Sequence, residues 1–325
     1  FPALQDTRQI TLQHRLESVK ILPPNGFPEN NPQSYGSITQ SAVSLAEINN
    51  NERSRVFCTA VTNENVSGAR ASTWSAAIDQ ASFGFMPADE NQGPKRLFVI
   101  SAGNIPAELD AARLIDPTQA PIEDPAQAWN ALTVGGYTEK TIIDEPGYED
   151  WQPLAESGSL SPFSRTSVTW PQGKSPFKPD LVMEAGNRAT SPEGTQVLTL
   201  DSLSLLTTGE DIAQNPLRSF SATSAAAAQA SRLCASINAV YPEIWPETIR
   251  ALMVHSAEWT PSMFDELNEA RNLAERYPIL RKFGHGVPNL ERALASASNH
   301  LALVAQNEIH PFSCNNGQKR FGDSH

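Results

Sequence analysis

The segment Arg96-Leu-Phe-Val-Ile-Ser-Ala-Gly-Asn104 decides the fold class of this chain. Residues 96–100 contain an unbroken apolar run, which is typical of a strand buried on both faces, as in a parallel sheet. The run leads directly into the small residues Ser101-Ala-Gly103 and then Asn104. A strand of this kind needs helices above and below it, so the segment predicts a sheet inside a layered α/β fold.

The rest of the chain alternates strand and helix patterns, as such a fold requires. We expect further strands at 18–22, 55–61, 131–134 and 180–183, and helices at 38–48, 73–81, 221–240, 246–256 and 289–297. The stretches 105–125 and 139–175 are rich in turn residues and are predicted to be surface loops. The sequence therefore predicts a three-layer α/β/α domain with a mainly parallel sheet over residues 1–298. Residues 299–325 are predicted to be a tail or the start of a further segment, with a strand at 300–311.

Composition and charge narrow the classes of function. Lys plus Arg number 24 and Asp plus Glu number 36, which gives a net charge of −12. Nucleic acids and anionic membranes are bound by clustered basic residues, so neither is expected as a partner. No apolar run approaches the ~18 residues of a membrane span, and residues 1–10 lack the pattern of a signal peptide. These features favour a cytoplasmic location.

The cysteines and histidines do not predict a metal site or a disulfide framework. Cys58, Cys234 and Cys314 are odd in number and widely spaced, which is typical of free thiols in a reducing compartment. The six histidines show no paired-ligand spacing, and no calcium loop of the usual acidic pattern occurs. We therefore expect no cofactor and no metal ion.

Several motifs, in one order along the chain, resemble the subtilisin-like serine peptidases of family S8. The resemblance covers about residues 15–298 and depends on the order of the motifs more than on any one of them. The matching segments are Val19–Leu22, Phe98–Asn104, Trp129–Gly135, Pro162–Ser164, Lys178–Val182 with Gly186, Ser221–Ala226, Pro246–Leu252 and Gly284–Asn289.

The resemblance implies a peptidase that cleaves polypeptides through an acyl-enzyme on Ser224. A serine at a helix start is exposed, and the free N–H groups there favour developing negative charge. Asn104 is implied as the donor to the oxyanion, and Ser101, Ala102 and Gly103 as one wall of the pocket for the residue before the scissile bond. Two positions depart from the family pattern, because Ala222 replaces a glycine and Ala228 replaces a proline.

The general base and its orienting carboxylate are the larger departure. A serine triad needs both, and in this family both precede the strand matched by Val19–Leu22. Asp6-Thr7-Arg8 and His14 match the family motifs poorly and are interpreted as coincidental. We therefore expect residues 1–325 alone to be inactive, with a central strand, the Asp and the His supplied by an upstream segment or a second chain.

Other interpretations remain open. An α/β-hydrolase would use Ser224, Asp265 and His285, which follow the right chain order, although Ala-Thr-Ser-Ala-Ala is a poor nucleophile elbow. A binding or regulatory module that keeps the fold without catalysis would explain the missing base. The simpler interpretation of His285 is a turn residue, and of His255 a residue on a helix face. No glycine-rich phosphate loop follows any strand, which disfavours a nucleotide-binding protein.

Overall fold

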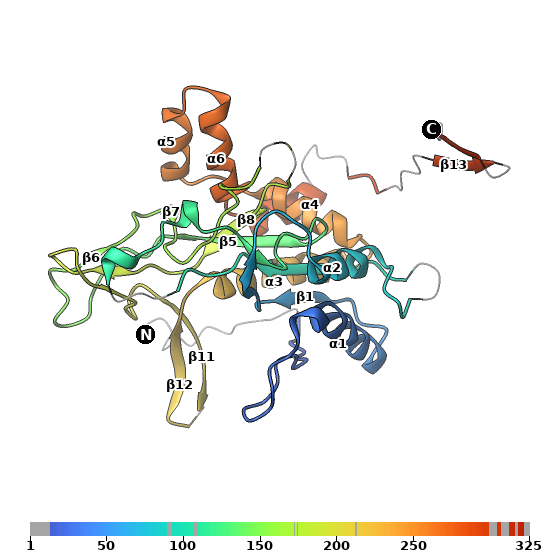
Figure 1. The fold of residues 1–325 in the computed structure, drawn as a ribbon, viewed down its shortest axis with the longest axis horizontal. Coiled ribbons are helices and arrows are strands. Elements are labelled where there is room, and N and C mark those ends of the chain that lie inside the picture. Colours follow the sequence, from blue (N-terminus) through green and yellow to red (C-terminus); the bar gives the residue numbers. More distant parts are fainter. Residues whose placement is uncertain are drawn as a thin grey trace.

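The computed structural model describes residues 14–89, 93–106, 110–171, 173, 175–211, 213–298, 304–306, 312–315 and 318–321. Its centre is a five-stranded sheet in which β1, β3, β5 and β8 run parallel and β7 pairs antiparallel with β5 (Figure 1). The order is β1-β3-β5, with β8 paired to β5 as well. These strands span Val56–Thr59 (β1), Leu97–Ser101 (β3), Leu132–Thr138 (β5), Ser159–Leu160 (β7) and Leu181–Glu184 (β8).

Helices cover both faces of the sheet, which confirms the predicted α/β class with a mainly parallel sheet. Successive residues of β3 alternate between the two layers. Leu97 and Val99 pack in one apolar cluster with α3, α4 and α7, whereas Phe98 and Ile100 pack in another with α1 and α2. The helices span Tyr35–Asn49 (α1), Thr73–Phe83 (α2), Thr223–Val240 (α3), Pro246–Ser256 (α4), Pro261–Glu269 (α5), Leu273–Phe283 (α6) and Leu290–Ser298 (α7).

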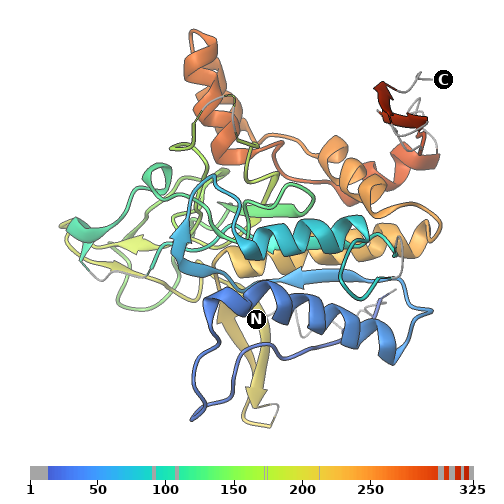
Figure 2. The same cartoon turned by 45° about the vertical axis from the view of Figure 1, so that its right-hand side comes forward.

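Smaller elements fill the long connections. Antiparallel pairs form between β2 (Asn63–Ser67) and β4 (Glu123–Asp124), and among β6 (Gln152–Pro153), β9 (Ala189–Thr190) and β10 (Val197–Leu198). A hairpin of β11 (Leu205–Asp211) and β12 (Asn215–Phe220) projects from the body in both views (Figure 1, Figure 2). Another hairpin joins β13 (Phe312–Asn315) to β14 (Gln318–Phe321), and 3₁₀ turns lie at Pro32–Ser34, Ala111–Arg113 and Pro117–Gln119.

The structure agrees with most predicted elements and corrects three predictions. The stretches predicted as surface loops, 105–125 and 139–175, also contribute β4, β6 and β7. Residues 18–22 form no strand, because an extended segment counts as one only where a neighbouring strand pairs with it. β5 continues through Gly135 and Gly136, where the sequence suggested a stop. A side chain at Gly136 would collide with Ala185 at 2.5 Å, so this glycine serves close packing and not a turn. The hairpins β11–β12 and α5–α6 were not predicted, and the strand predicted at 300–311 lies largely outside the described residues.

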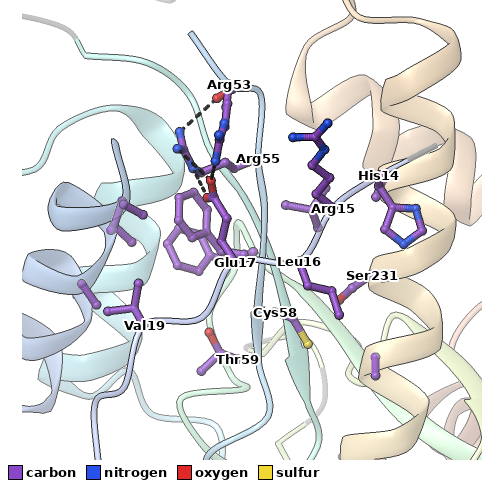
Figure 3. A pocket seen from close by; sticks show the side chains of 18 of the residues that line it. His14, Arg15, Leu16, Glu17, Val19, Arg53, Arg55, Cys58, Thr59 and Ser231 are labelled. Atoms are coloured by element: carbon purple, nitrogen blue, oxygen red, sulfur yellow. Dashed lines mark hydrogen bonds and ion pairs between the residues drawn. The ribbon is translucent and has the colours of Figure 1, made fainter. Parts of the chain in front are cut away.

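The edge strand β1 differs from the other parallel strands in what lies beside it. Its described pairing is with β3 alone, and its free edge borders a cavity of about 780 Å³. The cavity lies between α1, α3 and the extended residues 14–21 (Figure 3). Glu17 fixes that extended segment through contacts with Arg53 and Arg55. The layered fold is therefore packed on the side of β5 and β8 and hollow on the outer side of β1.

Candidate active site

The start of α3 lies at the carboxyl ends of the parallel strands. The Ala222 N–H donates to the carbonyl of Ala185, which directly follows β8, at 2.7 Å. Ser224 is the second residue of α3, and its Oγ donates to the Ala60 carbonyl, just past β1, at 3.3 Å. The Ser224 side chain is half-buried, and the sequence prediction of a serine at a helix start agrees with this geometry.

Asn104 lies against the same helix start. Its Oδ1 accepts hydrogen bonds from the backbone N–H of Thr223 at 2.8 Å and from the Thr223 hydroxyl at 2.7 Å. Because a backbone N–H can only donate, these bonds identify the atom facing α3 as the oxygen. The Nδ2 of Asn104 is therefore turned away from Thr223, and no group of the described residues accepts from it. The carboxamide is held as an oriented donor next to Ser224.

Ser101, Ala102 and Gly103 link β3 to Asn104 and are buried. The Ser101 hydroxyl is enclosed without a hydrogen-bond partner in the described part of the chain. Gly103 has φ +93°, and a side chain there would lie 2.5 Å from the carboxylate of Glu123. Glu123 was not singled out from the sequence, because a carboxylate in a turn-rich stretch is usually solvated; here it is 3% exposed.

Glu123 joins the segments that follow β1 and β3. Its Oε2 accepts from the Thr62 hydroxyl at 2.5 Å, and its Oε1 is paired with Nε of Arg165 at 2.8 Å. Arg165 also donates to the Asn104 carbonyl at 2.8 Å. Burial raises the pKa of Glu123, while the Thr62 hydroxyl, Arg165 and the Asn104 N–H act in the opposite direction.

The described histidines do not lie at Ser224. His14 lines the cavity near Ser231, which is seven residues, or about 10 Å, further along α3. His255 is exposed near the end of α4, in agreement with a helix-face residue. Asp6 lies outside the described residues, so its interpretation is not tested.

The arrangement contradicts the α/β-hydrolase triad. The backbone N–H of His285 donates to the Asp180 carbonyl, at the amino end of β8. The helix carrying Ser224 is bonded to Ala185, at the carboxyl end of the same strand. The two points are five residues apart along the strand, which is about 17 Å, and Asp265 is exposed on α5. That alternative is therefore wrong, and the turn interpretation of His285 agrees with its exposed position.

The cavity beside β1 reaches the neighbourhood of Ser224. Its lining includes Ala60, whose carbonyl accepts from Ser224, and Ala228, one turn further along α3. Ala228 is exposed, although Ala225, Ala226 and Ala227 just before it are buried. Cys58 also faces the cavity as a free thiol, and the protein groups around the cavity desolvate the thiolate and raise its pKa (Figure 3).

No group of three or more potential His, Cys, Asp or Glu ligands comes together in the described ranges. Of the helices that the structure describes, none combines the length and apolarity needed to cross a bilayer.

Comparisons with known proteins agree with the motif order. The chain is 24% identical over 287 residues to the uncharacterised protein y4bN of Sinorhizobium fredii, covering 83% of this chain and 63% of that relative. A protease of Pseudoalteromonas arctica matches in structure with a TM-score of 0.44 and 17% identity, over 85% of this chain and 55% of that one. The model of the subtilase family, peptidase S8, matches residues 3–286. The chain therefore belongs to the subtilase family of peptidases.

Proposed function

We propose that this chain carries the nucleophile half of a serine endopeptidase, with Ser224 forming the acyl-enzyme. The observation that carries the proposal is the contact between Asn104 and the start of α3. It orients a carboxamide donor beside a serine whose own backbone N–H has no acceptor among the described residues. Both features stabilise the oxyanion that forms when a serine attacks a peptide carbonyl.

Asn104 and Ser224 have separate roles in this proposal. The Ser224 oxygen attacks the carbonyl carbon and loses its proton to a base. The carbonyl oxygen becomes negative and accepts from Asn104 Nδ2 and from the backbone N–H of Ser224. Ser101, Ala102 and Gly103 form one wall beside the substrate residue that precedes the scissile bond.

We further propose that the base and its carboxylate come from polypeptide outside the described residues, either another part of the same protein or a second chain. The cavity along β1 supports an added strand as the occupant. The free edge of β1 offers unpaired N–H and C=O groups, and apolar side chains such as Val19, Val43 and Phe57 line the space. A strand parallel to β1 would end near Ala60, close to Ser224.

Labelling by a fluorophosphonate tests the proposal in the full-length protein. We expect a single adduct on Ser224, lost in Ser224→Ala, and a turnover lower by about 10²–10³ in Asn104→Ala, the loss known for the oxyanion-hole asparagine of subtilisin. Ser236→Ala, at a half-buried serine further along α3, is the matched control and keeps the label. Folded protein without an adduct on Ser224 would overturn the proposal.

The absence of an imidazole at Ser224 among the described side chains favours one second candidate, a binding or regulatory module without catalysis. The two candidates differ in the labelling experiment. The module predicts no adduct, and it predicts peptide binding that Ser224→Ala leaves unchanged.

A further inference from the structure

The buried carboxylate of Glu123 has no role in the chemistry described above, yet it lies beside the proposed substrate wall. Its side chain passes directly over the Cα of Gly103: an added Cβ there would meet Oε2, Cδ and Cγ of Glu123 at 2.5, 2.6 and 2.7 Å. The same Oε2 also accepts a hydrogen bond from the Thr62 hydroxyl at 2.5 Å. One side chain therefore connects the segment after β3 to the segment after β1.

Both of these segments also contact the start of α3. Ala60, two residues before Thr62, accepts from Ser224, and the Gly103 carbonyl accepts from the Thr223 hydroxyl at 2.9 Å. A substrate side chain that enters between these two segments from Ser224 would meet Glu123 at the bottom. β4 fixes the depth of Glu123, because this strand pairs with β2, with Ser67 opposite Glu123.

We propose that Glu123 is the floor of the pocket for the residue before the scissile bond and restricts that residue to small side chains such as Gly, Ala or Ser. The inference rests on the proposed function and adds the class of substrate. Glu123 acts as a specificity-determining residue and takes no part in bond cleavage.

The Glu123 carboxylate could either close the pocket or attract a basic residue of the substrate, and its contacts distinguish these two roles. Its Oε1 is paired with Arg165, which is itself 12% exposed and bonded to the carbonyls of Asn104 and Pro121. A lysine or arginine of the substrate would have to displace this guanidinium and leave it buried without its partner, which is strongly unfavourable. The paired carboxylate therefore fills space and is not available as a counter-ion.

Peptide substrates that differ only in the residue before the scissile bond test the proposal in the full-length protein. We expect the wild type to cleave after Ala and to discriminate against Phe, Leu and Lys. Glu123→Ala should raise cleavage after Leu or Phe relative to Ala by about tenfold or more, because the shorter side chain leaves space at the floor of the pocket. Glu123→Gln keeps the size of the side chain and should keep the preference for small residues.

A control variant and a binding measurement separate the proposed pocket from the proposed catalysis. Asp124→Asn changes the neighbouring buried carboxylate, which faces Ser72 and Gln127 instead, and should leave the preference unchanged. In the Ser224→Ala background, binding of the same peptides should show the same order without catalysis. If Ser224 takes no fluorophosphonate, the proposed function fails, while peptide binding still reports the pocket size.

Equal cleavage after Ala and Phe by the wild type would overturn the inference, and this result does not depend on any variant folding. The inference is also overturned if Glu123→Ala and Glu123→Gln have the same selectivity, or if the wild type prefers Lys before the scissile bond.

Discussion

The two halves of the central sheet differ in what covers their strands. β3 is fully buried at every residue, because β1 and β5 flank it and helices cover both faces. β1 is half-buried, with Cys58 exposed, and its outer edge borders a cavity of about 780 Å³. β1 and β3 pair regularly with each other, Val56 to Thr59 opposite Leu97 to Ile100. The difference in burial therefore comes from what lies beside each strand and not from an irregularity in either strand.

The comparison shows that the two halves of the sheet contribute different parts of the candidate site. The packed half contributes Asn104, which follows β3, and it anchors the start of α3 through Ala185. The hollow half borders Ser224 on the side where the described residues offer no base. The cavity therefore lies where the proposed added strand would bring a base to Ser224.

The largest expected effect on the free energy of unfolding comes from the same substitution, Val→Ala, made in each half of the sheet. Val99 and Val56 contribute to the same apolar cluster from neighbouring strands, but only Val99 is fully buried. We expect Val99→Ala to lower the free energy of unfolding by about 2–3 kcal/mol and Val56→Ala by about 1 kcal/mol or less, because a half-exposed methyl pair loses less burial. Urea denaturation of the full-length protein measures both.

Equal costs for the two valines would contradict a hollow half in the protein as tested. If the cavity is filled by an added segment in that protein, the cost of Val56→Ala should rise toward that of Val99→Ala. The pair of variants therefore also reports whether the cavity is occupied.

A smaller effect is expected at the ion pairs that tie α1, on the hollow side, to β3. Arg96 precedes β3 and contacts Glu47 of α1 at 2.7 Å and Asp89 at 2.9 Å. The hydrogen bonds from Arg96 hold the pKa of Asp89 below its usual range. Asp89→Asn should cost about 1–3 kcal/mol at pH 7, as expected for a buried hydrogen bond to a charged group.

The pH dependence of that loss follows from the sign of the pKa shift. Because the folded-state pKa is lowered, the stabilisation is fully present above the usual pKa of about 3.9 and is lost as pH falls through the folded value. Wild type and Asp89→Asn should therefore converge in stability in acid. Asp110→Asn, in an exposed pair with Arg113, is the control and should change little at any pH. A gap that stays constant down to acid pH would contradict the assignment.

The smallest effect is expected at Ala222, where α3 begins. Its backbone has φ +88° and ψ 172°, a region that is essentially restricted to glycine and costs about 1–3 kcal/mol for other residues. Ala222→Gly should raise the free energy of unfolding by about 1 kcal/mol, since the strain relieved is partly offset by the greater freedom of glycine in the unfolded chain. Thermal denaturation measures this gain, and a loss of stability would show that Ala222 is not strained.

Elements whose own residues carry the periodic pattern were predicted well. The bounds of α4 agree with the prediction, and α2 ends where Gly84 adopts φ +83°. β3 was predicted correctly because its continuous apolar run by itself indicates a strand that is buried on both faces. Elements that depend on distant partners were predicted less well. Residues 18–22 have strand composition, but no described strand pairs with them. β5 runs past two glycines because Ala185 and Pro179 pack closely against them.

The sequence by itself determined the α/β class, the order of the family motifs, and a serine at a helix start. These depend on local periodicity and on short motifs, which are written within a few consecutive residues. Only the tertiary structure decided that Asn104 orients its carboxamide through Thr223, that Glu123 lies beneath Gly103, and that β1 borders a cavity. These features join residues from 20 to more than 100 positions apart, and their burial and hydrogen bonding arise only when the strands and α3 come together.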